Sequence, residues 1–225
     1  MRRLVRFLSV VVLLSALCAC GKSEEAKPAR PAGAVLSGSV VFKPDEQAEP
    51  KPDAGARAYL FRRFEPTRPL KPQAVPDRPG ADAGSGVWLA AADAQGRYEI
   101  ADLAPGAYGL VIVSAAAARD ASARYEPELD LAARAEDLRR QADAIRGREP
   151  SAFEKSIALR QRSIEYSNLA ALREDVLGPH FAPGDQAAAL ARLGADVRKF
   201  QSFGLTVEAA GGRLERNANF GTGRR

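Results

Sequence analysis

Cysteine and histidine are scarce in this 225-residue sequence, which contains two cysteines and one histidine. Such low numbers exclude a zinc site built from cysteine and histidine, a fold held by several disulfides and catalysis by several histidines. The sequence also lacks the signatures of phosphate-binding loops, dinucleotide-binding turns, zinc proteases and serine hydrolases. We therefore expect a protein that is not an enzyme and that uses no metal and no cofactor.

The sequence carries only a small excess of positive charge. Its formal net charge is +5, but Arg2, Arg3 and Arg6 lie in a segment that we interpret as a removed leader. Without these three arginines, 30 basic residues stand against 28 acidic ones. This balance predicts no nucleic-acid binding. A composition with 46% hydrophobic and 27% charged residues is instead typical of a folded globular protein.

The first 19 residues have the three regions of a secretory signal peptide: a basic start, an apolar run over Phe7–Ala16 and small residues at the end. The apolar run is too short to cross a bilayer of about 30 Å. The next residues, Leu17-Cys18-Ala19-Cys20, resemble the lipobox of bacterial lipoproteins. The resemblance implies that Cys20 becomes the lipidated, palmitate-bearing first residue. Lipidation of Cys18 would instead place Leu17 before the cleavage site, where the family has a small residue.

A lipidated Cys20 would anchor the protein in the membrane of the cell envelope. Gly21 follows this cysteine, which in the Gram-negative family pattern implies sorting to the outer membrane. An ordinary secretory signal with two incidental cysteines is the alternative. Residues 20–34 contain no large apolar side chain, so we expect them to form a flexible tether.

Short segments with strand patterns follow, separated by turns rich in glycine and proline. Alternating or apolar patterns predict strands at residues 36–42, 56–62, 87–92, 97–100 and 108–114. The proline-dense residues 64–86 predict a loop. Short strands joined by tight turns favour an antiparallel sandwich over a parallel sheet.

One run within these strands resembles a known family. Asp93–Leu110 resembles the D-x-x-G-x-Y/F-x-I-x-x-L-x-P-G-x-Y-x-L core of carboxypeptidase regulatory-like domains, and Leu36–Val40 resembles their first strand. These domains are transthyretin-like sandwiches, similar to Cna-type B repeats of bacterial surfaces. The resemblance implies an antiparallel transthyretin-like β-sandwich. Family members usually join the last two strands briefly, so a helical insertion before the last strand, which makes the expected fold α+β, departs from the family pattern. The resemblance implies no peptidase activity, because the zinc ligands of the peptidase domain that these domains flank in some proteins have no counterpart in this sequence. The family is a scaffold with many roles.

Helical spacing replaces alternation after Ser114. Apolar stripes at intervals of three and four residues occur over 131–145, 153–176 and 190–200. Glu136 and Arg140 are spaced as an i,i+4 ion pair in the first stretch, and Asp185 is placed to cap the third. We expect the stripes to pack on each other or on the sheet. A projecting arm that docks on the helices of a partner is the alternative.

Alternation returns at Phe203–Ala209, so we expect this segment to pair with the strand at Tyr108–Val113. Residues 115–201 would then be a helical insertion in one sandwich made of residues 35–114 and 202–220. If so, a short linker should be able to replace residues 116–200 without unfolding the sandwich.

These features predict a non-enzymatic, membrane-anchored envelope lipoprotein that serves as a protein-binding or assembly scaffold for an envelope protein partner. The alternative is a carbohydrate-binding module facing the periplasm or the cell surface, because starch-binding domains have related folds. Its candidate contact residues are aromatic: Trp88, Tyr59, Tyr125 and Tyr166. We expect His180 to be solvated or packed and Glu126–Asp130 to be a solvated charge run, because it lacks the spacing of a calcium loop.

Overall fold

The computed structural model describes residues 33–45, 47–63, 69–82, 85–146, 150–208 and 211–221. Cys20, the expected signal peptide and all but the end of the expected tether therefore lie outside the described residues. Within the described segments, no helix is both long enough and apolar enough to span a membrane.

The described residues form two β-sheets, and the first is centred on one strand, β1 (Ala34–Phe42). Its antiparallel neighbours are β2 (Lys51–Pro52) and β6 (Arg97–Leu103). Its parallel neighbours are β9 (Arg213–Glu215) and β10 (Ala218–Phe220). Parallel pairing departs from the expected all-antiparallel sandwich. It arises because the chain crosses from the second sheet to the first after β8 instead of turning back beside a neighbouring strand.

The second sheet is antiparallel throughout and has the order β4-β5-β3-β7-β8. Its strands are β3 (Arg57–Arg63), β4 (Gly80–Asp82), β5 (Val87–Ala91), β7 (Gly106–Ala118) and β8 (Arg198–Val207). A 3-10 turn, η1 (72–74), lies in the proline-dense loop. Together with the helices, these sheets confirm the α+β class.

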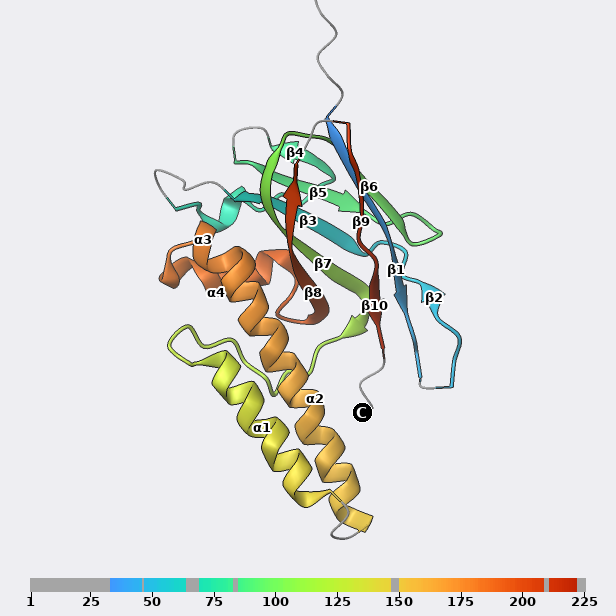
Figure 1. Cartoon of the computed structure of the whole chain (residues 1–225), viewed down its shortest axis with the longest axis vertical. Helices are drawn as coiled ribbons and strands as arrows, with labels where there is room; N and C mark the ends of the chain where they lie inside the picture. Colours follow the sequence, from blue (N-terminus) through green and yellow to red (C-terminus); the bar gives the residue numbers. More distant parts are fainter. Residues whose placement is uncertain are drawn as a thin grey trace, which may run out of the picture. The chain divides into compact units, whose positions relative to one another are not determined.

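Strands β7 and β8 are neighbours although the helices lie between them in the sequence (Figure 1). Tyr108 is opposite Leu205 and Leu110 is opposite Phe203, which confirms the predicted pairing for the part of the segment that the structure describes. Both strands are longer than predicted. The helical connection therefore begins after Ala118 and ends before Arg198.

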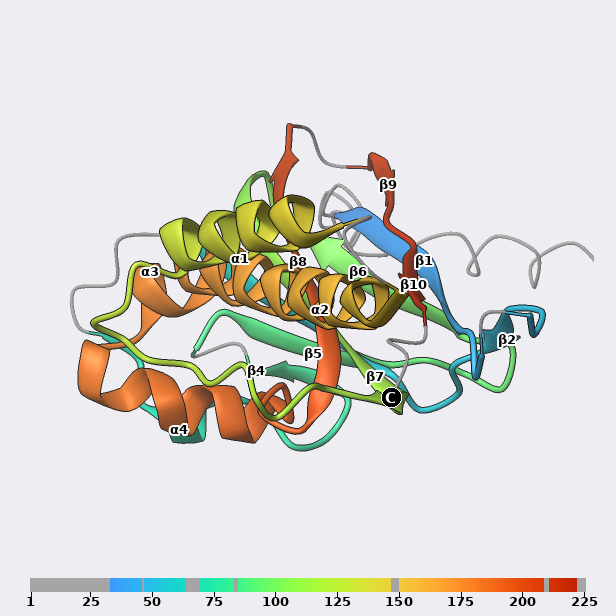
Figure 2. The same cartoon turned by 90° about the horizontal axis from the view of Figure 1, so that it is seen from below.

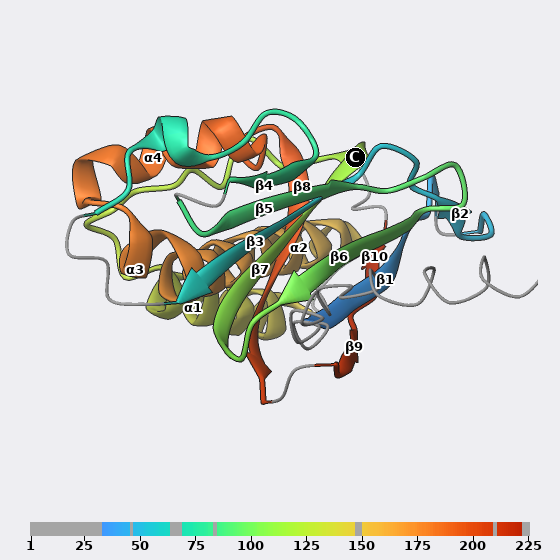
Figure 3. The same cartoon turned by 90° about the horizontal axis from the view of Figure 1, so that it is seen from above.

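Strand β7, which lies between β3 and β8, is buried on both faces, which explains its continuous apolar run. Leu110 and Ile112 belong to the core between the two sheets. Val111 and Val113, which point the opposite way, belong to a second core between the sheet and the helices. The fold thus has three layers, with the helices on the face of the second sheet that is remote from β1 (Figures 2 and 3).

The helical layer consists of α1 (Leu131–Ile145), α2 (Pro150–Leu172), the π-helical turn η2 (Arg173–Leu177), α3 (Gly178–His180) and α4 (Pro183–Leu193). Turn η2 rests directly on β7 at Gly109. A Cβ atom at Gly109 would lie 2.7 Å from the carbonyl oxygen of Asp175, so only glycine allows this approach.

The third helix is shorter than its apolar spacing predicts. It ends at Leu193 because Gly194 adopts a left-handed conformation, with φ of 77°. Val197 is consequently 62% exposed, and Phe200 belongs to β8. The predicted cap is also wrong, because the helix has no side-chain cap and Asp185 instead forms an ion pair with Lys71, 2.9 Å away.

The helical layer covers apolar side chains of the second sheet. Tyr59, Phe61 and Val111 are fully buried against the helical layer. A short linker in place of residues 116–200 would transfer these side chains to water. We therefore expect such a linker to destabilise the sandwich, which differs from the expectation based on strand alternation alone.

Candidate functional site

The pair formed by α1 and α2 is the candidate site, and its geometry begins at a capped helix start. The Asp130 side chain accepts a hydrogen bond from the backbone N–H of Ala133, 2.9 Å away, which satisfies a free donor in the first turn. The predicted α1 stripe is buried, with Leu131 and Leu138 among its fully buried members. The polar face of α1 remains in solvent.

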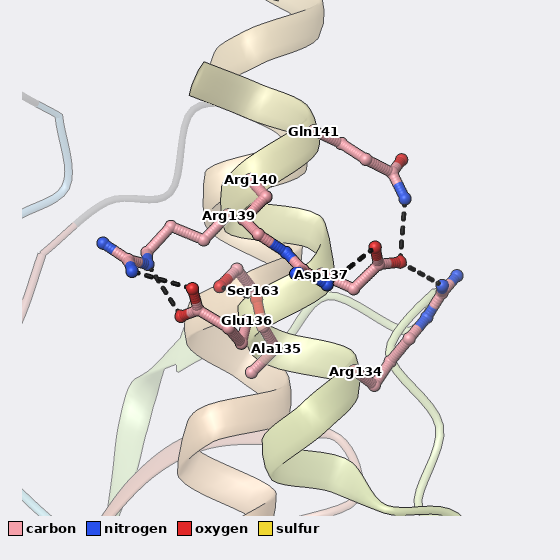
Figure 4. A network of polar contacts seen from close by, with 8 residues as sticks. All are labelled: Arg134, Ala135, Glu136, Asp137, Arg139, Arg140, Gln141 and Ser163. Carbon is pink, nitrogen blue, oxygen red and sulfur yellow. Dashed lines mark hydrogen bonds and ion pairs between the residues drawn. The ribbon is translucent and has the colours of Figure 1, made fainter. Parts of the chain in front are cut away.

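Small residues allow α2 to lie very close to α1. The Ser163 hydroxyl donates to the carbonyl oxygen of Ala135, 2.6 Å away, and the Ser156 hydroxyl donates to that of Ala142, 3.0 Å away. Figure 4 shows Ser163 beside Ala135. The donors are seven residues apart on α2 and the acceptors seven apart on α1, so the same contact recurs after two turns of an antiparallel pair.

A groove of about 400 Å³ runs between the two helices. Small side chains line most of it, with charged groups at its rim. The lining residues are Ala132, Ala135, Glu136 and Arg139 on α1, Ser163, Ser167, Ala170 and Ala171 on α2, and Glu174 on η2. The groove exists because alanine and serine leave space that longer side chains would fill.

The charges on the α1 side neutralise one another. The Glu136 carboxylate accepts two hydrogen bonds from Arg139, at 2.8 and 2.9 Å, and this contact lowers the pKa of Glu136 (Figure 4). Arg140 lies 3.7 Å from Asp137, so the predicted pair between Glu136 and Arg140 is wrong. The i,i+3 spacing, which also places residues on one helix face, is used instead.

Two large apolar side chains on one face of α2 point into solvent. Phe153 is 53% exposed and Ile164 is 59% exposed, and Ile157 on the same face is half-buried. The remainder of the predicted stripe, which includes Leu169 and Leu172, is buried in the core. The stripe therefore has two parts on different faces of α2. Ile164 points in nearly the same direction as Phe153, whereas Leu169 and Leu172 point roughly 100 to 160° away from it, toward the core. The start of α2 also extends beyond the sheet (Figure 1).

A buried ion pair connects α2 to the sheet. Arg119, which follows β7, donates through Nε to Glu165 on α2 at 3.2 Å and also donates to the carbonyl oxygen of Ala123. Its guanidinium lies 6.0 Å from the ring centroid of Phe200 on β8. Burial raises the pKa of Glu165, although the charges of Arg119 and Lys199 lower it in part. This contact holds the middle of α2 in a defined position.

The residues with catalytic or metal-binding potential do not converge. No group of three His, Cys, Asp or Glu residues suited to a metal occurs among the residues that the structure describes. His180 is buried, as one of the two expected outcomes, with Nδ1 3.0 Å from the carbonyl oxygen of Val176 and Nε2 2.8 Å from that of Arg62. It thus links α3 to β3. Glu126 and Glu128 are exposed, as predicted.

The four candidate aromatic residues are not assembled into one surface. Tyr59 and Tyr166 are buried in the core beneath the helices, and half-buried Tyr125 packs on the same core. Half-buried Trp88 packs on the other core, with its ring edge-on to Tyr108 at a centroid distance of 5.9 Å. The second sheet therefore separates Trp88 from the other three, and two of the rings have no face available to a sugar.

No protein-family model and no curated protein sequence matches this chain. Among solved structures, a protein from Pseudomonas aeruginosa proposed to bind carbohydrate is 18% identical, with a TM-score of 0.23, over 37% of this chain and 66% of that chain. A minor pilin of the Gram-positive pathogen Streptococcus agalactiae is 19% identical, with a TM-score of 0.27, over 40% of this chain and 35% of that chain. The chain thus matches less than two thirds of either, and likeness at this level carries no argument.

Sequence reasoning identified the apolar stripes but missed the groove. A signal for it was present: Ala135 and Ala142 repeat at seven residues on α1, and Ser156 and Ser163 repeat at seven residues on α2. Small residues at heptad spacing favour close helix packing. The partner helix that they face is defined only by the tertiary structure.

Proposed function

We propose that this chain is a non-enzymatic, membrane-anchored envelope lipoprotein that acts as a protein-binding or assembly scaffold through the exposed side of the α1–α2 pair. The exposure of Phe153 and Ile164 on one face of α2 carries this proposal. Burying a large apolar side chain is worth about 1.5 to 3 kcal/mol. A partner that covers both side chains would therefore gain binding energy that the isolated chain does not use.

The proposal includes the fold family: the sandwich belongs to the transthyretin-like, carboxypeptidase regulatory-like group. The motif that carries the resemblance has the expected physical roles. Gly96 and Gly106 have positive φ angles of 74° and 150° at its two turns. Its alternating apolar residues, such as Ile100 and Leu110, are buried in the core between the sheets.

The resemblance of residues 17–20 to a lipobox supports anchoring through Cys20 in the cell envelope, and Gly21 supports the outer membrane as the proposed location. Labelled palmitate fed to expressing cells should enter the wild-type chain and the Cys18→Ser variant. It should not enter the Cys20→Ser variant, which should also leave the membrane fraction. Label retained by Cys20→Ser would contradict the anchor.

The docking face can be tested in cells with a photo-crosslinking amino acid at position 164 of the full chain. We expect a discrete crosslinked species from position 164. A matched probe at Lys51, exposed on β2 in the first sheet, should produce none. The same species from both positions, or none from position 164, would contradict docking at this face.

No observation favours the carbohydrate-binding alternative. A sugar platform requires exposed aromatic faces, and the burial of Tyr59 and Tyr166 removes two of its four candidates. The remaining two, Trp88 and Tyr125, lie on opposite faces of the second sheet.

A further inference from the structure

One face of α2 has a bulky exposed side chain near its start and a groove lined by small residues near its end. Phe153 and Ala171 are 18 residues apart, which is five full turns, so they lie on one line along the helix. The Phe153 end of this line presents a bulky, exposed ring. The Ala171 end presents the groove, whose lining of alanine and serine leaves space.

We propose that the partner of this face is a second copy of the same chain, packed with its α2 antiparallel to the first about a two-fold axis. This inference rests on the proposed function, because it names the partner of the same surface. The axis passes at the level of residue 162, halfway between Phe153 and Ala171. Each Phe153 then lies in the groove of the other copy, and the two Ile164 side chains meet near the axis. A two-fold contact of this kind is closed and buries the same patch on both chains.

The charges of the face suit this arrangement. Glu174 is exposed at the end of the groove and forms no ion pair with any residue that the structure describes. The antiparallel packing places Glu174 at the level of the first turn of the α2 of the second copy. That turn contains no acidic residue, and the N-terminal end of a helix attracts negative charge. The two-fold axis produces this contact between Glu174 and the start of α2 twice in the dimer.

The other charged groups on this side do not oppose the contact. Glu136 is held by Arg139, and Arg160 lies 2.5 Å from Asp143. Apart from Glu174, these charges are already paired within each copy and add no excess of one sign. Like-charge repulsion between two identical faces is thereby avoided.

The available area is close to what a stable dimer requires. The 23 residues of α2 span about 35 Å, and two adjacent helices are about 20 Å wide. Helix α1 has only 15 residues and spans about 22 Å, so the side of the pair offers about 570 Å² on each copy. The smallest stable interfaces bury about 600 Å² per partner. Anchoring of both copies on one membrane would raise their effective concentration further.

Single cysteines in the full chain, crosslinked in membranes with a short bismaleimide, test the packing. Ile164→Cys alone should yield a species of twice the monomer mass, because the two positions meet near the axis. Phe153→Cys alone and Ala171→Cys alone should not, because about 27 Å separates each from its own copy. Differently tagged Phe153→Cys and Ala171→Cys chains, expressed together, should yield a mixed dimer in which one native Phe153–Ala171 contact remains. Wild type, without an added cysteine, controls for Cys20.

Each result decides between the proposals. Dimers from Phe153→Cys alone would mean parallel packing and would overturn the inferred arrangement. Absence of all dimers, while the photo-crosslinker at position 164 still captures a different protein, would overturn the second-copy inference and leave the proposed function standing. Absence of every crosslink at this face would overturn both.

Discussion

The hydroxyl group of Ser163 on α2 donates a hydrogen bond to the backbone carbonyl oxygen of Ala135 on α1, 2.6 Å away. A side chain thus contacts the backbone of the neighbouring helix directly. Ser163 lines the groove but is buried against α1, whereas one turn later Ser167 is exposed in the groove. We therefore expect α2 to accept a larger side chain at position 167 but not at position 163.

Replacement of Ser163 by leucine should destabilise the protein by about 1 to 3 kcal/mol, because the extra volume forces the helices apart. The same change at Ser167 should alter the free energy of unfolding by less than about 0.5 kcal/mol, because the side chain enters the open groove. Urea denaturation of both variants checks this. Equal losses would show that the close contact between α1 and α2 is not a constraint.

Gly38→Ala should loosen the last strands from β1. A Cβ atom at Gly38 would lie 1.7 Å from the carbonyl oxygen of Arg216, the atom that also accepts a hydrogen bond from the Tyr98 hydroxyl at 2.8 Å. We expect a loss of about 2 kcal/mol or more in the free energy of unfolding. Gly184→Ala, where nothing lies within 4 Å of the added atom, is the matched control and should be nearly neutral. A neutral Gly38→Ala would disprove the close approach.

The protonation of Glu165 should make the free energy of unfolding depend on pH. Burial raises the pKa of Glu165 in the folded chain above its ordinary value of 4.5, so the folded state takes up this proton at higher pH than the unfolded state. The resulting stabilisation is complete below pH 4.5 and is lost as the pH rises through the raised pKa. Relative to Glu165→Gln, which cannot titrate, wild type should therefore gain stability as the pH falls from 7 toward 4.5. Urea denaturation of both proteins across this range measures the difference, and a shift in favour of the variant would contradict it.

Replacement of residues 116–200 by a short Gly/Ser linker should yield a chain that aggregates. The linker would expose Tyr59, Phe61 and Val111, which the helical layer buries completely. Large exposed apolar patches drive association. Light scattering and dye binding on the purified variant test this expectation. A monomeric, folded variant would show that the sandwich is independent of its helices.

The residues of β7 and β8 contain enough information to predict their pairing. Period-two alternation in Phe203–Val207 requires a half-buried strand, and the strand that ends the first half of the sandwich lacks a neighbour without it. The helical spacing of Leu131, Leu138 and Ala142 likewise predicts a buried stripe on α1, which the structure contains. These features are local periodicities, so the sequence by itself determined them.

Other features depend on which segments meet, and only the tertiary structure decided them. The parallel pairing of β9 and β10 with β1, the coverage of Leu169 but not Ile164, and the bond between Ser163 and Ala135 all join positions distant in the sequence. An apolar stripe indicates that burial of that helix face is favourable. It does not specify where the covering layer ends, because that depends on the lengths and positions of elements elsewhere in the chain. Phe153 and Ile164 are exposed because neither the sheet nor α1 covers their face of α2.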